Sequence, residues 1–98
     1  MAAYLIADVD VSDPVVYEEY KQKVSATSAP YGARYLTRGA ATQVLEGDWS
    51  PTRFVIMEFP SAEHIKTWYD SPEYRPLRDI RQRSARSIMI IVDGIESR

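Results

Sequence analysis

A run of apolar residues at positions 53–59, with the sequence RFVIMEF, constrains the fold of this chain most strongly. Apolar side chains stand on both alternating faces, so the run predicts a β-strand that is covered on both sides. Pro60 and Ser61 then start a helix whose apolar side chains can cover one of these sides. A chain of 98 residues has little left to cover the other side, which suggests a second copy of the protein.

The segments before this run predict a strand and a helix. Residues 4–11 alternate with a period of two, as strands do. Asp13 can cap a helix and Pro14 suits its first position, and this helix should extend to about Ser28. Its apolar stripe consists of Val16, Tyr17, Tyr20 and Val24.

A long hairpin is expected next. Residues 33–38 form its first strand, and residues 42–45 form a short extension. The turn at 47–51 contains Gly, Asp and Pro and leads into the strand at 53–59. Three side chains are predicted to share one face of the first strand: Arg34, Leu36 and Arg38.

The last third of the chain predicts a further helix and a final strand. Ser71 is the expected cap of the helix and Pro72 its first residue. The strand at 87–92 is almost continuously apolar, so it should be central or covered on both faces. The apolar face of the helix consists of Tyr74, Leu77 and Ile80.

The predicted order is β-α-β-β-α-β with an additional helical segment before the last strand, the split βαβ arrangement of ferredoxin-like domains. We therefore expect a single α+β domain over residues 1–98, with an antiparallel sheet covered by helices on one face. The apolar side chains left on the other face are too many to remain in water. Two such sheets packed face to face would bury them, so we expect a homodimer.

Composition and charge exclude several classes of function. The chain has no cysteine, one histidine at position 64 and 4 isolated glycines, so it lacks a zinc site, a thiol nucleophile and a glycine-rich phosphate loop. The 12 Lys and Arg against 14 Asp and Glu provide no basic surface for nucleic acid, and no segment is apolar enough to span a membrane. We therefore expect no bound metal, no cofactor, no nucleic-acid partner and no membrane partner. The expected location is the cytoplasm.

Arginines between positions 75 and 86 look like a basic patch, but Glu73 and Asp79 dilute them and the whole chain is acidic. A solvated helix face is therefore the prediction for this group. The arginines are Arg75, Arg78, Arg81, Arg83 and Arg86.

Charged side chains beside apolar strands are the candidate catalytic residues, because ionised groups are expensive there unless they are paired or used. Glu58 lies near the end of the 53–59 strand. It is either ion-paired with Arg38 or Arg34, or it handles protons in a pocket that also holds Arg38. Asp48, in the preceding turn, is a candidate ligand-binding residue.

Three aromatic residues are candidate walls of a ligand cleft. Tyr20 lies on the first helix, and Trp68 and Tyr69 lie on the helix after the 53–59 strand. Each of them has the alternative of being a core residue. Two alternatives are open for Asp8, on the first strand: its side chain lies on a solvated face, or it has a binding role.

The chain also resembles a known family. The segments YLIADVDVSDPVVYEEY, YGARYLTRG, EGDW, EFPS and WYDSPEY, in this order, are similar to the DUF1330 family within the dimeric α/β-barrel superfamily. The resemblance implies a ferredoxin-like subunit whose sheet packs on that of a twofold mate. It brings no established reaction with it.

Relatives in the wider superfamily include cofactor-independent quinol monooxygenases, haem-degrading monooxygenases, muconolactone-isomerase-like enzymes and stress-response barrels. Their ligands lie in a cleft between sheet and helices. Haem-degrading members use a histidine ligand, which residues 71–74 do not supply here, and His64 precedes Trp68 by one turn. The resemblance therefore does not favour haem.

Three functions remain open at this point. The first is a dimer that binds a small aromatic or carboxylated molecule in each subunit, with Arg38 as anion partner and Tyr20, Trp68 and Tyr69 as walls. In its enzymatic form Glu58 would remove a proton, as in a cofactor-independent monooxygenase or isomerase. The alternatives are a binding protein without turnover and a stress-response interaction protein.

Overall fold

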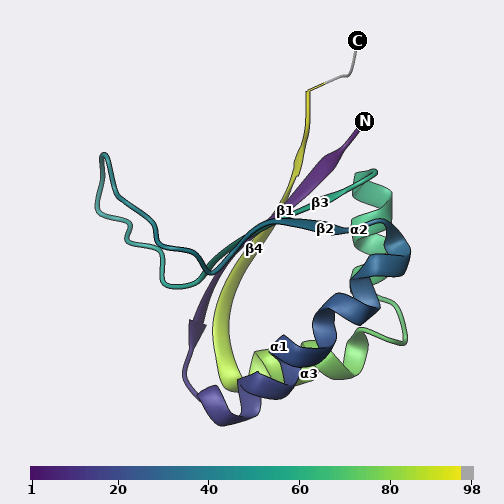
Figure 1. The fold of residues 1–98 in the computed structure, drawn as a ribbon, viewed down its shortest axis with the longest axis horizontal. Helices are drawn as coiled ribbons and strands as arrows, with labels where there is room; N and C mark the ends of the chain where they lie inside the picture. The colour runs from purple at the N-terminus through teal and green to yellow at the C-terminus, as the bar shows by residue number, and fades with distance from the viewer. Residues whose placement is uncertain (96–98) are drawn as a thin grey trace.

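The computed structural model describes residues 1–95 of the chain. Its elements are β1 (Ala3–Val11), α1 (Pro14–Ser28), the 3-10 helix η1 (Ala29–Tyr31), β2 (Arg34–Arg38), β3 (Phe54–Phe59), α2 (Ala62–Tyr69), α3 (Arg75–Ser84) and β4 (Ala85–Asp93). The strands form one antiparallel sheet in the order β2-β3-β1-β4, and the α-helices lie together on one face of it (Figure 1). This is the α+β architecture that the sequence predicts.

The first two helices start where capping side chains accept free backbone N–H groups. Asp13 accepts from the Val16 amide at 3.2 Å at the start of α1, and Ser61 accepts from the His64 amide at 3.2 Å at the start of α2. Both caps confirm the predicted starts. None of the helices within residues 1–95 has the length and apolarity that a membrane crossing requires.

The start of α3 differs from the prediction. The helix begins at Arg75 and not at Pro72. The Ser71 hydroxyl donates to the Trp68 carbonyl at 2.7 Å and accepts from the Tyr74 amide at 3.2 Å, so it closes a turn that follows directly on α2. This turn brings Tyr74 into the core, where it is fully buried.

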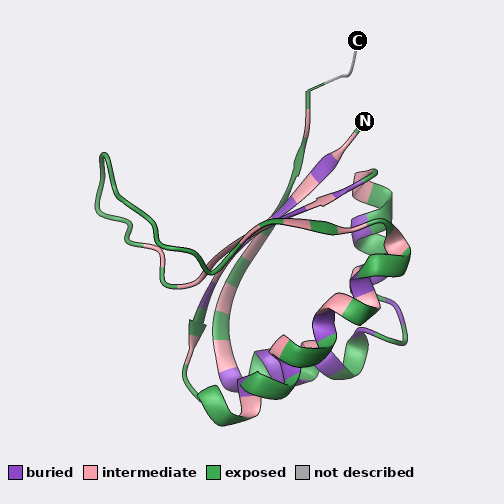
Figure 2. Ribbon diagram, in the orientation of Figure 1, coloured by how far each residue is buried: buried purple, intermediate pink, exposed green. Residues whose placement is uncertain are grey.

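The hydrophobic core lies between the sheet and the helices (Figure 2). Alternate residues of the strands face it, as the period-two pattern of β1 predicts, and the helices contribute their apolar stripes. The buried core residues are Ala3, Leu5, Ala7, Val9, Tyr17, Tyr20, Val24, Met57, Phe59, Ile65, Trp68, Tyr74, Leu77 and Ile80.

The other sheet face, called the outer face below, is not covered by any helix of residues 1–95. It carries the second set of alternate side chains, which pair across the strands as Ile56 with Ile6 and Ile6 with Ile90. Ile88 is 67% exposed and Ile90 is 52% exposed. Of the two alternatives predicted for the last strand, the central position is wrong, because β3 and β1 are the inner strands and β4 forms an edge, whereas cover on both of its faces stays a prediction.

Residues 39–53 connect β2 to β3 as a loop that projects away from the sheet (Figure 1). The predicted strand extension at 42–45 is wrong, because these residues pair with no strand within residues 1–95. Val44 and Leu45 are 48% and 97% exposed. The predicted hairpin is therefore a strand pair with a long loop instead of a tight turn.

A bulge in β2 changes which side chains share a face. Tyr35 pairs with Met57 and Thr37 pairs with Ile56, so Leu36 is an extra residue. Beyond the bulge Arg38 lies on the helix side of the sheet, as Tyr35 does. The prediction that Arg34, Leu36 and Arg38 share one face is wrong for this reason.

Candidate functional site

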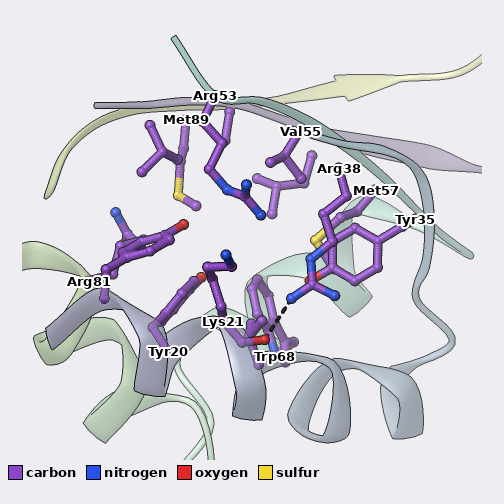
Figure 3. A pocket seen from close by; sticks show the side chains of 15 residues that line it. Tyr20, Lys21, Tyr35, Arg38, Arg53, Val55, Met57, Trp68, Arg81 and Met89 are labelled. Atoms are coloured by element: carbon purple, nitrogen blue, oxygen red, sulfur yellow. Dashed lines mark hydrogen bonds between the residues drawn. The ribbon is translucent and has the colours of Figure 1, made fainter. Parts of the chain in front are cut away.

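A cavity of about 30 Å³ lies between the sheet and the helices, with room for roughly two water-sized groups. Figure 3 shows Arg53 and Met89 reaching into it from the sheet side, and Tyr20 and Trp68 from the helix side. The wall is largely apolar and aromatic. The lining residues are Leu5, Ala7, Val9, Tyr17, Tyr20, Lys21, Val24, Tyr35, Arg38, Arg53, Val55, Met57, Trp68, Arg81 and Met89.

Arg38 closes one side of the cavity. Its guanidinium donates to the Lys21 carbonyl at 2.7 Å and to the Ser25 hydroxyl at 3.1 Å, so it bridges β2 to α1. The guanidinium carbon also stands 4.5 Å from the centroid of the Tyr35 ring. The bridge depends on the bulge, since a regular strand would turn Arg38 to the outer face.

Arg53 and Arg81 reach the cavity from opposite layers of the fold. Arg53 follows the 39–53 loop, and its buried Nε atom has no hydrogen-bond partner within residues 1–95. Arg81, on α3, is only 4% exposed, and its Nε donates to the Tyr74 hydroxyl at 3.3 Å. The predicted solvated face is therefore wrong for Arg81, because this side of α3 packs against α1 and carries the arginine inward.

The hydroxyls of Tyr17 and Tyr20 at the cavity are neutral. Tyr20 and Tyr74 share a hydrogen bond of 2.8 Å between their hydroxyls. Burial, together with the nearby Tyr74, raises the pKa of Tyr20 well above its ordinary value. Burial also raises the pKa of Tyr17, although the Arg53 guanidinium opposes this shift. Neither phenol supplies a negative charge to the arginines at neutral pH.

The candidate aromatic walls are divided between the cavity and a neighbouring groove. Tyr20 and Trp68 are core residues, which confirms that alternative, and they also line the cavity, so their role as ligand walls stays a prediction. Tyr69 lines an apolar groove of about 220 Å³ between α2 and β4. Leu5 and Met89 line both hollows, so the two are neighbours.

The structure does not bring Glu58 or Asp48 into this cavity. Glu58 lies on the outer face, where its carboxylate pairs with Arg34 and accepts from the Tyr4 hydroxyl at 3.4 Å. The ion-pair alternative is confirmed with Arg34, whereas Arg38 lies on the opposite face of the sheet. Asp48 stands in the exposed 39–53 loop.

Asp8 has a role that its alternating pattern does not reveal. Its carboxylate accepts hydrogen bonds from the Trp49 indole at 3.1 Å, from the Thr52 amide at 2.9 Å and hydroxyl at 3.0 Å, and from the Arg53 amide at 3.3 Å. It thereby fixes the end of the loop that delivers Arg53. No local motif signals this contact, because the partners are 41 to 45 residues apart.

Residues 2–95 match the family described as "Domain of unknown function (DUF1330)". The chain belongs to the DUF1330 family. No curated protein matches this DUF1330 chain. Within residues 1–95 it has no group of three His, Cys, Asp or Glu side chains placed to hold a metal ion.

Solved structures similar to this DUF1330 protein share its fold. The RPA0582 protein from Rhodopseudomonas palustris is 18% identical with a TM-score of 0.78, over 98% of this chain and 84% of that chain. SnoaB, a cofactor-independent oxygenase from Streptomyces nogalater, is 10% identical with a TM-score of 0.66, over 98% and 95%. A dimeric ferredoxin-like protein from Jannaschia sp. CCS1 is 7% identical with a TM-score of 0.71, over 96% and 100%. These likenesses confirm the predicted ferredoxin-like fold.

Glu58→Gln in this DUF1330 protein is expected to lower the free energy of unfolding by about 1 kcal/mol or less. The Arg34 side chain of the pair is 71% exposed and the Glu58 side chain 23% exposed, so water screens the interaction. Urea denaturation would measure the effect, with Arg34→Gln as the matched variant. A loss of several kcal/mol in either variant would contradict this weak surface pairing.

The hydrogen bonds to Asp8 predict that part of the stability of the fold is lost in acid. Desolvation raises the pKa of Asp8, but the hydrogen bonds from Trp49, Thr52 and Arg53 together outweigh it and hold this pKa below its ordinary value of 3.8. A lowered pKa stabilises the fold fully above pH 3.8, and this contribution disappears as the pH falls through the lowered value. Asp8→Asn should remove that part of the pH dependence in urea denaturation from pH 6 to about 2. Parallel curves for both proteins would contradict the prediction.

Two glycines offer a test of how Arg53 is held. Gly39 and Gly47 have φ angles of 72° and 96°, so alanine should cost about 1 kcal/mol of stability at either position. A Cβ at Gly39 would in addition collide with the Arg53 guanidinium, whereas one at Gly47 meets nothing within 4 Å. We expect similar urea midpoints for the two variants, but a changed Arg53 side-chain resonance only in Gly39→Ala. An unchanged resonance there would contradict this packing.

Proposed function

We propose that the protein binds a small organic molecule, aromatic or carboxylated, between sheet and helices, in the space formed by the cavity and the groove next to it. The observation that carries the proposal is a cavity with aromatic walls in which, within residues 1–95, every charged lining residue is basic. Tyr20 and Trp68 serve as walls. Arg38 serves as an anion partner at the edge, where its bonds to α1 can be exchanged for bonds to a ligand.

The binding unit of this proposal is a homodimer joined through the outer faces. Phe54, Ile56, Ile88 and Ile90 place apolar side chains there, and Ile88 and Ile90 are more than half exposed in one subunit. An apolar surface of this kind is characteristic of a protein interface. The description of the Jannaschia protein as dimeric supports the same assembly.

A catalytic version has less support from the geometry. Among residues 1–95, no carboxylate and no imidazole line the cavity, and Glu58 lies on the other face of the sheet. A general base must reach the proton that it removes, and Glu58 cannot do so from there. The fold shared with SnoaB keeps a cofactor-independent oxygenase as the second candidate, because such chemistry can proceed on the substrate itself.

Native mass spectrometry of the purified protein tests the proposal. A dimer that retains a small organic molecule, released on denaturation, would support it. Arg38→Gln should reduce the retained fraction, whereas Arg34→Gln, on the outer face of the same strand, should leave it unchanged. Retention that is equal in both variants would contradict the role of Arg38. Oxygen uptake with the released molecule as substrate would favour the oxygenase.

A further inference from the structure

The cavity contains positive charge that nothing in the described chain neutralises. Arg53 and Arg81 both line it, and none of the lining residues within residues 1–95 is acidic. The salt bridges of this range involve neither of the two arginines. Buried guanidinium groups are normally paired, because removing an ion from water costs several kcal/mol.

The hydrogen bonds of the two arginines leave donors free as well. Arg81 is 4% exposed and donates from its Nε atom to the Tyr74 hydroxyl, and it forms no bond to a carboxylate within residues 1–95. The Nε atom of Arg53 is buried without any partner within residues 1–95. A guanidinium has five N–H donors in a planar fork, which matches the two oxygens of a carboxylate. An anion between the two layers would satisfy both groups.

The size and surroundings of the cavity restrict this anion. About 30 Å³ accommodates a head group of two oxygens, but not an organic body. The apolar groove next to it offers about 220 Å³, and Leu5 and Met89 belong to both walls. Met89 is unbranched and only partly buried, so it can change rotamer and join the two spaces.

We propose that Arg53 and Arg81 form an anion seat for an amphipathic organic monocarboxylate, whose apolar body lies in the groove between α2 and β4. This inference rests on the proposed function and specifies its ligand class. The carboxylate binds between the arginines, and Ile65, Tyr69 and Met89 contact the body. A free phosphate lacks the apolar part that would fill the groove.

The test measures thermal stability with formate, naphthoate and the uncharged naphthamide at constant ionic strength. A ligand that binds only the native state raises the Tm by an amount that grows with the logarithm of the ratio of its concentration to its Kd. We expect naphthoate to bind at least tenfold more tightly than naphthamide, with formate giving a smaller shift. Arg53→Met and Arg81→Met should each lose the response to both carboxylates. Arg83→Met, two residues further along α3 and exposed, should keep it.

The ligand-free proteins provide a second readout. Removing an unpaired buried charge relieves its desolvation cost, so Arg81→Met should melt at the same temperature as the wild type or higher. Circular dichroism would show that both variants are folded, and Arg81→Gln, which also removes the charge, replaces Arg81→Met if that variant is not.

Two outcomes would overturn the anion seat and not the proposed function. One is equal binding of naphthoate and naphthamide, which would place a neutral ligand in the cavity. The other is the absence of any carboxylate response that depends on Arg53 and Arg81, while native mass spectrometry still shows a retained molecule. A protein that retains nothing and responds to none of the three probes would contradict both proposals.

Discussion

Ile88→Lys is expected to convert the proposed homodimer into a folded monomer. Ile88 lies on the outer face opposite Asp8 of β1, so a lysine there gains an opposite charge as its cross-strand neighbour. The isolated subunit therefore loses little stability. In a face-to-face dimer both lysines would leave water. The Asp8 carboxylate already accepts hydrogen bonds from Trp49, Thr52 and Arg53, so it compensates a buried ammonium group only in part, and we expect a cost of about 3 to 5 kcal/mol. The dissociation constant should rise by more than about 100-fold.

Sedimentation velocity over a range of protein concentrations would measure this change. Val15→Lys is the matched control, because Val15 is 83% exposed on α1 and α1 lies on the opposite face of the sheet. It should sediment as the wild type does. Far-ultraviolet circular dichroism would show that both variants are folded. If Ile88→Lys sediments like the wild type at every concentration, the outer face is not the dimer interface.

The fold was predictable because each element repeats a local rule. The stripe of Tyr17, Tyr20 and Val24 buries one side of α1, and the alternation in β1 buries one face of the strand. Asp13 and Ser61 fix helix starts through bonds to residues three positions away. These signals depend on sequence neighbours only, so they can be recognised in a single sequence.

The site depends on long-range geometry that has no local signal. One extra residue in β2 turns Arg38 to the helix side, and this separates it from Glu58. Arg81 belongs to a run of charged residues and gives no sign that it is buried. Arg53 reaches the cavity because Asp8, 45 residues away, holds its amide. Sequence reasoning therefore found Arg38 and the cavity residues on α1 and α2, but it did not place Arg81 inside the cavity.

The two continuous apolar runs also separate what a local pattern predicts from what depends on long-range geometry. RFVIMEF correctly predicts a strand with apolar side chains on both faces, since Met57 and Phe59 are buried under helices and Phe54 and Ile56 lie outside. The run at 87–92 has the same character but belongs to an edge strand. Apolar side chains on a strand show which of its faces must be buried. The order of the strands in the sheet depends instead on how the helices connect them.

Trp68→Ala is expected to destabilise the protein by about 3 to 5 kcal/mol, a large part of the total of roughly 5 to 15 kcal/mol for a domain. Trp68 is fully buried. Its ring packs on Tyr74 and Phe59 with centroid distances of 4.0 and 5.6 Å, and its indole N–H donates to the Thr27 hydroxyl at 3.1 Å. Truncation would leave a cavity at the junction of α2, β3 and the turn before α3. The midpoint and slope of urea denaturation would measure the loss.

Trp49→Ala is the matched control for the size of the side chain. Trp49 is 57% exposed, so its removal should cost about 1 kcal/mol, largely from the hydrogen bond to Asp8.

Trp68→Phe keeps most of the ring, and the Thr27 hydroxyl retains its bond to the Val24 carbonyl at 2.7 Å. This variant should stay folded and bind the ligand more weakly, because Trp68 is also a cavity wall. A loss in Trp68→Ala no larger than in Trp49→Ala would contradict the core role and leave only the role of ligand wall.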